Sequence, residues 1–414
     1  MTEFSMLGLA PRLMKALEAQ GYTDPTPIQA KAIPHILDGR DIMGLAQTGT
    51  GKTAAFGLPL VHQLLQIGTA PTPKTARALI LAPTRELANQ ITDNLSGFIK
   101  GAHLRITHVV GGTSINVQIK NLTRGTDILV ATPGRLLDLI DRRAISLSET
   151  RFLVLDEADQ MLDLGFIHAL RKIAPLLATP RQTLLFSATM PKQMNELAQT
   201  YLNNPIRVQV SPPGKAADKV TQSVHFVQQT GKTALLKRLL AAHPGELALV
   251  FGRTKHGSER LKKQLEAEGF AAGSIHGNKS QGQRERTLQD FRNGKIKVLV
   301  ATDVAARGID IPGVAYVYNF DLPNVPENYV HRIGRTARAG ATGLAVAFCS
   351  PEETDELRAI EKVMGLSIAV ASGTRPAEAH KAHKPQPSKR NGPPQGSKPR
   401  RRFSGQKSRQ RAAA

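Results

Sequence analysis

The chain of 414 residues is poor in cysteine and in long apolar runs, and each shortage excludes a class of protein. Cys349 is the only cysteine, so an intramolecular disulfide and a thiolate metal site are both excluded. No apolar run approaches the roughly 20 residues of a membrane span. The first residues carry an acid and lack an export pattern, so we interpret them as mature sequence. We therefore expect a cytoplasmic protein without a membrane segment.

Acidic residues are also scarce: 33 Asp and Glu face 55 Lys and Arg, which gives a formal net charge of +22. Residues 372–414 hold 12 of the basic residues and one acid, Glu378, which is a net +11. This stretch is rich in Pro, Gly, Ser and Gln, so we predict that residues 369–414 form a disordered basic tail. Such a tail can serve solubility alone. We favour an arm that binds the phosphates of a polyanion and releases their counterions.

Apolar runs alternate with helical patterns through most of the length. The predicted strands are residues 41–46, 76–82, 127–131, 152–155, 183–186, 247–251, 297–301, 314–319 and 343–348. Continuous apolar strands with helices between them indicate an α/β fold with parallel sheets that helices cover on both faces. The stretch VSPPGKAADK, residues 210–219, is typical of a linker. We therefore expect two tandem domains, residues 1–208 and 219–368, joined by a linker at 209–218.

The stretch AQTGTGKT, residues 46–53, follows a predicted strand and precedes an apolar helical pattern. Glycines at such a place let backbone N–H groups face phosphates at a helix N-terminus. Lys52 can supply a charge to the β- and γ-phosphates of a nucleoside triphosphate, and Thr53 a hydroxyl ligand to Mg²⁺. Ala46 stands where the general pattern has Gly, and we expect its small side chain to fit. The predicted nucleotide-binding residues of this loop are Ala46, Gln47, Thr48, Gly49, Thr50, Gly51, Lys52 and Thr53.

A second Gly-Lys-Thr, residues 231–233, lies in a different context. Phe226 occupies the place of the small first residue, and no glycine lies between it and Gly231. We interpret this stretch as the start of a helix rather than a second nucleotide site.

The stretch RFLVLDEADQML, residues 151–162, places three acids directly after a short apolar run. Read alone, these acids could merely cap the next helix. A metal ion held by Thr53 and phosphate oxygens, however, needs a carboxylate from a neighbouring strand end, and Asp156 can provide it. The adjacent Glu157 can orient the attacking water or accept its proton. The acids then form a metal and water site beside the triphosphate.

The sequence DEAD at 156–159, together with AQTGTGKT and some ten motifs in all, resembles the DEAD-box ATP-dependent RNA helicases. The resemblance covers about residues 4–350. The compact core with a short basic tail is similar to the bacterial RhlE-type subgroup. The resemblance implies two RecA-like domains of the P-loop NTPase kind, which close around ATP and single-stranded RNA.

The resemblance also implies roles for residues outside the phosphate loop. Phe4 and Gln29, in a motif spanning about residues 2–30, would recognise adenine, and Asp310 would contact the ribose. Arg335 and Arg338 of HRIGRTAR would neutralise charge on the γ-phosphate, with Lys52, Asp156 and Glu157 as their catalytic partners. Coupling between hydrolysis and unwinding would rest on Asp159, Ser187, Thr189 and His331, with His331 paired to Asp159. Ala337 stands where family members commonly have Gly, and we expect its methyl group to affect the rate rather than the role.

The residues that would contact RNA are hydroxyls, glycines and arginines, which suit phosphate and 2′-OH contacts. Aromatic residues are few among them, so base stacking and sequence readout are expected to be minor. Each residue taken alone could equally serve as a helix cap or part of a turn. The set is Thr84, Arg85, Gly111, Gly112, Thr132, Pro133, Gly134, Arg135, Arg253, Gln281, Arg284 and Thr302.

We therefore predict an RNA-dependent ATPase that uses ATP and Mg²⁺ and separates short RNA duplexes without sequence preference. One alternative is an ATP-gated RNA clamp or scaffold in which unwinding is incidental. Another is a DNA helicase with a related core. Ribosomal precursors, mRNA decay and cold-stress remodelling are all compatible as sources of the RNA.

Overall fold

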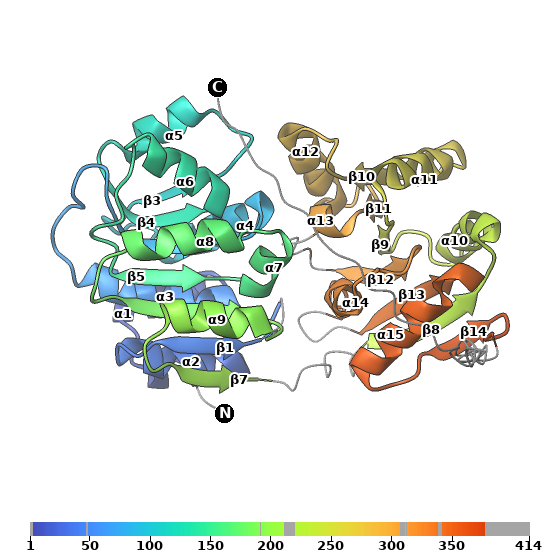
Figure 1. The fold of residues 1–414 in the computed structure, drawn as a ribbon, viewed down its shortest axis with the longest axis horizontal. Helices are drawn as coiled ribbons and strands as arrows, with labels where there is room; N and C mark the ends of the chain where they lie inside the picture. The colour runs from blue at the N-terminus through green and yellow to red at the C-terminus, as the bar shows by residue number, and fades with distance from the viewer. Residues whose placement is uncertain are drawn as a thin grey trace, which may run out of the picture. The chain divides into compact units, whose positions relative to one another are not determined.

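The computed structural model describes residues 3–46, 49–190, 192–210, 220–306, 311, 313–337 and 342–376. Helices and strands alternate along these residues, and the strands form two seven-stranded sheets (Figure 1). Every strand pairs in parallel with its neighbours. Among the described residues, no helix has the length and apolar character that a membrane span requires. The expected α/β fold with two parallel sheets is confirmed.

The first sheet has the strand order β3-β4-β2-β5-β6-β1-β7. Its strands are β1 Ile42–Leu45, β2 Ala76–Leu81, β3 Ile106–Val109, β4 Thr126–Ala131, β5 Phe152–Leu155, β6 Gln182–Ser187 and β7 Ile206–Gln209. Its helices are α1 Pro11–Ala19, α2 Pro27–Leu37, α3 Lys52–Leu65, α4 Arg85–Phe98, α5 Ile115–Leu122, α6 Pro133–Asp141, α7 Ala158–Asp163, α8 Ile167–Ile173 and α9 Lys192–Tyr201. Two short 3₁₀ turns, η1 Phe4–Leu7 and η2 Ala174–Leu176, complete this part.

Helices cover both faces of this sheet, because successive side chains of its strands point to opposite sides. In β2, Ala78 and Ile80 pack in the core cluster that includes residues of α1 to α4. Leu79 and Leu81 pack in the cluster that includes residues of α6 to α9. Because β2, β5, β6 and β1 are parallel neighbours, their carboxyl ends lie along one edge of the sheet. An open α/β sheet binds its ligands at this edge.

The second sheet has the order β10-β11-β9-β12-β13-β8-β14. Its strands are β8 Val220–Phe226, β9 Leu247–Phe251, β10 Ala272–Ile275, β11 Val298–Ala301, β12 Val314–Asn319, β13 Gly343–Cys349 and β14 Ala369–Ser372. Its helices are α10 Lys232–Ala241, α11 Lys255–Ala267, α12 Gln281–Arg292, α13 Asp303–Ala306, α14 Pro326–Ile333 and α15 Thr354–Met364. The 3₁₀ turns η4 Gln229–Gly231 and η5 Pro351–Glu353 precede α10 and α15.

All the strands predicted from apolar runs are present, with ends that differ by one residue at most. The prediction missed β3, β7, β8, β10 and β14. These strands lack a continuous apolar run: β8 reads VTQSVHF and β10 reads AGSI. They lie toward the sides of their sheets, where a strand needs fewer apolar residues than at the centre.

Two domain boundaries differ from the expected ones. Gln209, expected in the linker, ends β7, while residues 211–219 lie outside the described part. The tail was predicted from residue 369, but Ala369–Ser372 form β14 beside β8. Arg375 then donates to both carboxylate oxygens of Glu361, at 2.8 and 2.7 Å. The second domain therefore extends at least to Arg375, and residues 377–414 lie outside the described part.

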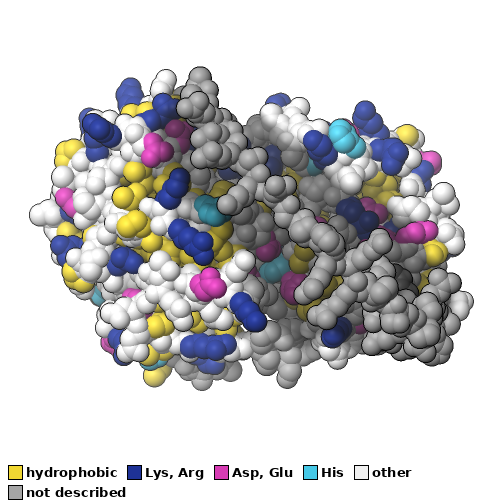
Figure 2. All heavy atoms as spheres, in the orientation of Figure 1, with side chains coloured by type: hydrophobic (Ala, Val, Ile, Leu, Met, Phe, Trp, Pro, Cys, Tyr) yellow, Lys and Arg dark blue, Asp and Glu magenta, His cyan; other side chains and the backbone are white. Residues whose placement is uncertain are grey.

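The basic residues of the described part do not gather at one place on the face that Figure 2 shows. Lys and Arg side chains are spread over that face, with Asp and Glu side chains between them. The net charge therefore does not locate a binding site on this face, and the contacts of individual charged residues are needed for that.

Candidate functional site

The phosphate loop connects β1 to α3, as expected. Ala46 follows β1 and donates its backbone N–H to Ser187 O at 3.0 Å. Gly49 and Gly51 adopt φ of 81° and 87°, a region that glycine enters without steric cost. The helix α3 begins at Lys52, and Thr53 lies in its first turn. Gln47 and Thr48 lie outside the described residues.

Gln29 links the segment before β1 to the phosphate loop. Its Oε1 accepts from the Thr26 N–H at 2.8 Å and completes a capping box on α2. Its Nε2 donates to Gly51 O at 3.0 Å. A Cβ at Gly51 would collide with Gln29 Nε2, so the close approach requires glycine there. Adenine recognition by Gln29 stays a prediction, because here both ends of the amide bind protein.

Phe4, the other predicted adenine contact, packs inside the first domain. Its ring is buried and meets Tyr22 edge to face, with centroids 6.3 Å apart. This position indicates a packing role at the start of the chain, and the proposed adenine contact stays a prediction.

Lys52 and Asp156 lie side by side at the end of the phosphate loop. Lys52 Nζ is 3.7 Å from Asp156 Oδ1, and both side chains are buried. A buried cation at a helix N-terminus is unfavourable, because the dipole there repels it and burial removes its hydration. Burial raises the pKa of Asp156 to about 6, although Lys52 opposes the shift. The arrangement costs stability and is the kind that functional sites keep.

Glu157 occupies a backbone conformation that side chains rarely adopt. Its φ is 51° and its ψ 51°, and its N–H donates to Asp156 Oδ1 at 3.0 Å. A non-glycine residue in the left-handed region costs of order 1–3 kcal/mol and persists where the surroundings hold it. The roles of Asp156 as a metal ligand and of Glu157 as the group that orients water stay predictions.

Asp159 binds the segment that follows β6. Its Oδ2 accepts from the backbone N–H groups of Ala188 and Thr189, at 3.1 and 2.8 Å, and from Thr189 Oγ1 at 2.9 Å. Ser187 Oγ donates to Thr189 O at 2.7 Å. The acidic segment therefore contacts the phosphate loop through Asp156 and the Ser187–Thr189 segment through Asp159. The predicted pairing of Asp159 with His331 stays a prediction.

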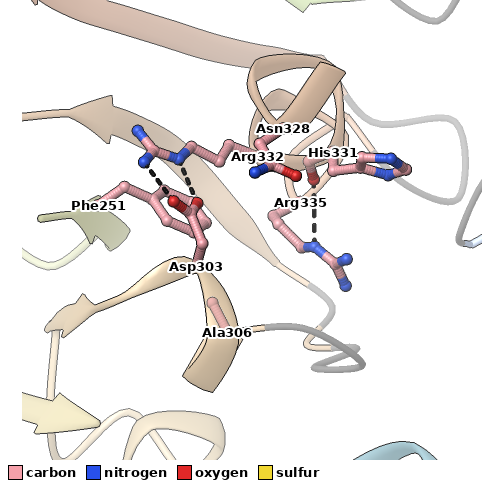
Figure 3. A pocket seen from close by; sticks show the side chains of 7 residues that line it. All are labelled: Phe251, Asp303, Ala306, Asn328, His331, Arg332 and Arg335. Atoms are coloured by element: carbon pink, nitrogen blue, oxygen red, sulfur yellow. Dashed lines mark hydrogen bonds and ion pairs between the residues drawn. The ribbon is translucent and has the colours of Figure 1, made fainter. Parts of the chain in front are cut away.

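His331 and Arg335 lie close together at the end of α14 (Figure 3). Arg335 is buried, and its Nε donates to His331 O at 3.3 Å. Ala337 has φ of 55°, a conformation that favours glycine. Arg338 and Asp310 lie outside the described residues, so their roles stay predictions.

Arg332 was not among the predicted site residues, yet it connects the segments around it. It donates to both oxygens of Asp303, and Nη1 donates to Asn319 Oδ1 at 3.1 Å and to Asp321 O at 2.7 Å. Its guanidinium also lies 5.0 Å from the centroid of the Phe251 ring. Figure 3 shows the pairing with Asp303. The signal in the sequence was the pair of polar residues that follow apolar runs, Asn319 at the end of β12 and Asp303 shortly after β11.

Several predicted RNA contacts of the first domain lie at helix N-termini. Thr84 caps α4 by accepting from the Leu87 N–H at 3.2 Å, and Thr132 precedes Pro133 at the start of α6. Arg85 packs on Gly111 and Gly112 so closely that a Cβ at Gly112 would collide with its guanidinium. Arg135 Nη1 donates to Thr113 O at 3.2 Å. Backbone N–H groups at such termini attract phosphate oxygens.

A groove of about 800 Å³ brings most of the predicted RNA contacts together. Arg284 Nη2 is 3.0 Å from Glu86 Oε1 in this groove. The predicted residues that line it are Thr84, Arg85, Gly111, Gly112, Thr132, Gly134, Arg135, Gln281 and Arg284. Arg253 points elsewhere, because its Nη2 binds Glu353 Oε1 at 2.7 Å and Leu322 O at 3.2 Å. Thr302 and Pro133 are not among the lining residues.

The second Gly-Lys-Thr starts a helix, as interpreted from the sequence. Gly231 ends η4 and Lys232 begins α10. Lys232 is fully buried, and its Nζ donates to Phe320 O at 2.8 Å and to the Glu353 carboxylate. Its charge is therefore neutralised inside the second domain.

Comparisons with known proteins agree with this geometry. The DEAD/DEAH box helicase family model matches residues 26–197, and the helicase conserved C-terminal domain model matches residues 231–340. The ATP-dependent RNA helicase CshA of Listeria monocytogenes is 46% identical over 362 residues, 87% of this chain and 69% of that protein. The DEAD-box ATP-dependent RNA helicase CshA of Bacillus subtilis is 46% identical over 359 residues, 87% of this chain and 72% of that protein.

A solved structure shows the same fold over most of the chain. The structure of S. cerevisiae Dbp5 bound to RNA and ADP BeF3 superposes with a TM-score of 0.81 at 32% identity, and the match covers 90% of this chain and 96% of that one. With the phosphate loop, the acidic segment and the two RecA-like sheets in place, these matches show that the chain belongs to the DEAD-box ATP-dependent RNA helicase family.

Proposed function

We infer that this chain is an ATP-dependent RNA helicase, an RNA-stimulated ATPase that separates short RNA duplexes. One observation carries the inference: a single acidic segment faces Lys52 through Asp156 and binds Thr189 through Asp159. A change at the phosphates can therefore reach the Ser187–Thr189 segment through four residues of backbone. This is the connection that coupling of hydrolysis to RNA release requires.

The residues at the end of the phosphate loop fit a nucleoside triphosphate with Mg²⁺. The hydroxyl of Thr53 and the carboxylate of Asp156 are the oxygen ligands that Mg²⁺ prefers, and Asp156 lies beside the phosphate-binding cation, with Oδ1 3.7 Å from Lys52 Nζ. When bound there, Mg²⁺ would neutralise charge on the β- and γ-phosphates. Lys52 holds the phosphates, and Glu157 orients the attacking water and accepts its proton.

The second domain supplies the remaining charges in our proposal. Arg335 and Arg338 neutralise the charge that develops on the γ-phosphate, Asp310 contacts the ribose, and His331 pairs with Asp159. ATP and RNA together favour the closed arrangement, and hydrolysis releases it. Each duplex step stacks by about 1–2 kcal/mol, so one closure cycle can distort a few base pairs.

The groove residues bind RNA in this proposal without reading its sequence. Hydroxyls, glycine amides and guanidiniums contact phosphate and sugar, which carry no sequence information. The proposed RNA contacts include Arg253 and Thr302 besides the groove residues. Ribosomal precursors, decay substrates and cold-stress RNAs all present such single strands and short duplexes.

Domain limits, subgroup and cellular place are proposals of the same kind. We place the ATP-binding domain at about residues 1–210, the second domain at about 219–376, and a basic tail after it. The compact core with a short tail supports the RhlE-type subgroup, while the two relatives described above carry the name CshA. The single cysteine supports a cytoplasmic location.

The test compares the wild-type chain with Glu157→Gln in ATP hydrolysis and in release of a strand from a short RNA duplex. We expect single-stranded RNA to stimulate wild-type hydrolysis, and Glu157→Gln to bind RNA with ATP but to lose turnover. If Glu157→Gln still performs the protein's full function in RNA retention, an ATP-gated clamp replaces the helicase. Equal stimulation by single-stranded DNA would overturn the choice of substrate.

A further inference from the structure

A cluster of polar side chains surrounds Glu259 in the second domain, apart from the nucleotide site. Glu259 lies in the first half of α11, and one of its oxygens, Oε2, accepts three hydrogen bonds. The donors are Ser274 Oγ at 2.6 Å, His276 Nε2 at 3.0 Å and Lys279 Nζ at 3.0 Å. Ser274 belongs to β10, and the other two donors follow it in the chain. One carboxylate therefore ties a helix to the segment that leaves the next strand.

The anchor of His276 is this carboxylate. The His276 side chain is 5% exposed, and none of the described residues supplies a hydrogen-bond partner for His276 Nδ1. Burial raises the pKa of Glu259, but hydrogen bonds from Ser274, His276 and Lys279 outweigh this effect and lower the pKa to about 2. The carboxylate is therefore ionised at neutral pH, and each of the three bonds to it is charge-assisted.

The anchored segment leads directly into the groove. Lys279 N donates to His276 O at 3.0 Å, so residues 276–279 form a turn. Ser280 then caps α12 in a capping box with Gln283. Gly277, Lys279, Ser280, Gln281 and Arg284 line the groove, whereas Glu259 and His276 are not among its lining residues. The position of this rim of the groove therefore depends on where the turn is held.

The face of β10 opposite to Ser274 packs against α12. Gly273 lies against α12 so closely that a Cβ there would be 3.0 Å from Thr287 Cγ2. Because successive residues of a strand face opposite sides, Ser274 points to α11 and Glu259. Packing through Gly273 holds the body of α12, and the carboxylate of Glu259 holds the turn before it.

We propose that Glu259 is a positioning residue for RNA binding: it holds the turn of residues 276–279 and so aligns Lys279, Gln281 and Arg284 with the RNA backbone. The proposal rests on the proposed function of the groove. Lys279 has three donor hydrogens, so it can keep its bond to Glu259 and still contact a phosphate. Loss of the carboxylate frees the turn, and RNA binding then has to order it again.

Two effects of removing Glu259 oppose each other, and their salt dependence separates them. Loss of a negative charge near the groove strengthens long-range attraction for RNA, an effect that salt screens. Loss of the ordered turn weakens binding at every salt concentration. We assign the larger effect to the turn, since it leads into α12, which carries Gln281 and Arg284 of the proposed RNA contacts.

The experiment measures ATP hydrolysis by the full chain against oligo-U concentration for wild type, Glu259→Gln and Glu259→Asp. For Glu259→Gln we expect the half-saturating RNA concentration to rise about tenfold, which is the effect of about 1.4 kcal/mol. The rate at saturating RNA and the KM for ATP stay within about twofold, because the nucleotide site is unchanged. Glu259→Asp restores part of the RNA affinity, and the loss in Glu259→Gln grows at higher salt.

Glu266→Gln is the matched control, since it removes an equal charge from the same helix. Glu266 pairs with Lys262 within α11 and is absent from the cluster, so wild-type RNA affinity is expected. Ser274→Ala removes one donor only and serves as a milder variant, with a smaller loss in the same direction. Hydrogen exchange in residues 276–284 is expected to quicken in Glu259→Gln, while β10 stays protected.

The outcomes distinguish failure of the positioning role of Glu259 from failure of the proposed helicase function. If RNA does not stimulate the wild-type ATPase, the proposed function fails. If RNA stimulates the wild type and Glu259→Gln binds oligo-U as tightly or more tightly, the positioning role is overturned. A lower melting temperature with unchanged RNA affinity would likewise assign Glu259 to stability alone.

Discussion

Arg332 donates to both carboxylate oxygens of Asp303, with Nε 2.5 Å from Oδ1 and Nη2 2.7 Å from Oδ2. Asp303 begins α13 directly after Thr302, and Arg332 lies on α14 between His331 and Arg335. The pair therefore joins two segments to which the proposed mechanism gives RNA and nucleotide contacts. Only guanidinium has the fork that binds a carboxylate through two parallel bonds.

We expect Arg332→Lys to lower the free energy of unfolding by about 3 kcal/mol, because it leaves the buried Asn319 Oδ1 and one oxygen of the partly buried Asp303 without donors. RNA-stimulated hydrolysis falls as well, even well below the melting temperature. Urea unfolding and ATPase assays measure the two effects. Arg358→Lys is the control, since Arg358 pairs with Asp355 on the surface of α15 and should change stability by less than about 0.5 kcal/mol. Equal losses of unfolding free energy in Arg332→Lys and Arg358→Lys would contradict a structural role for the pairing of Arg332 with Asp303.

Gly51→Ala should abolish the close approach between Gln29 and the phosphate loop. The added Cβ meets Gln29 Nε2, and the φ of 87° adds strain of about 1–2 kcal/mol. We expect ATP affinity to fall by more than about tenfold, measured with a fluorescent nucleotide. Adding Gln29→Ala removes the collision but leaves the strain and takes away the predicted adenine contact, so the double variant should recover only part of the loss.

Gly68→Ala is the control for this substitution, because a Cβ there meets no atom within 4 Å. Nucleotide affinity should stay at the wild-type value. A full recovery of ATP binding in the Gly51→Ala, Gln29→Ala double variant would contradict both the strain at Gly51 and the predicted adenine contact of Gln29.

Much of the candidate nucleotide site could be located from the sequence because it depends on short stretches of chain. Apolar runs identified β1 and β5, and parallel strands bring their carboxyl ends to one edge, so Asp156 was expected beside the loop that carries Lys52 and Thr53. The letters around Lys52 then specified a phosphate loop. These conclusions needed no knowledge of which side chains meet.

The remainder depends on pairs of residues that are far apart in the sequence. Nothing local shows that Arg332 turns inward to Asp303, or that Glu259 meets donors in β10 and in the turn after it. Strand β8 was missed because its polar residues interrupt the apolar pattern, although it lies between β13 and β14 in the sheet. The boundary of the tail was misplaced because one ion pair, Arg375 with Glu361, anchors a segment of ordinary linker composition.

Ala337 has a positive φ, so replacing it by glycine should not destabilise the protein. The left-handed conformation costs alanine about 1–2 kcal/mol, and glycine loses about 0.5–1 kcal/mol more entropy on folding. We therefore expect Ala337→Gly to stabilise by up to about 1 kcal/mol and to keep or raise the ATPase rate. Ala359→Gly, in the middle of α15, should instead destabilise by about 1 kcal/mol. If Ala337→Gly destabilises the protein as Ala359→Gly does, the backbone at residue 337 is not strained.

The depressed pKa of Glu259 predicts how acid affects the stability of the second domain. The folded pKa of about 2 lies below the ordinary 4.5, so the ionised carboxylate stabilises the fold above pH 4.5, and this contribution is lost as the pH falls toward 2. The difference in unfolding free energy between wild type and Glu259→Gln should therefore be constant near neutral pH and narrow below about pH 4.5. Urea titrations at each pH measure this difference. Titration of the other groups affects both proteins equally and so cancels from the difference. A difference that widens in acid would contradict the assignment.

Two truncations separate the folded end of the second domain from the basic tail. Removing residues 377–414 takes away 11 Lys and Arg but leaves β14 and the pairing of Arg375 with Glu361. We expect basal ATPase and the urea midpoint to be unchanged, while RNA affinity falls and its dependence on salt flattens. For every RNA phosphate that the tail neutralises in the full chain, the slope of log affinity against log salt should become shallower by about 0.7.

Removing residues 369–414 should add a loss of stability, because it exposes the edge of β8 and takes away Ser372, whose Oγ lies 2.7 Å from His225 Nδ1. The longer truncation therefore lowers the urea midpoint, whereas both truncations share the same flattened salt dependence. An unchanged salt slope in the shorter truncation would count against a phosphate-binding arm, because a tail that serves solubility alone releases no counterions from RNA. Equal midpoints for the two truncations would remove β14 from the folded domain.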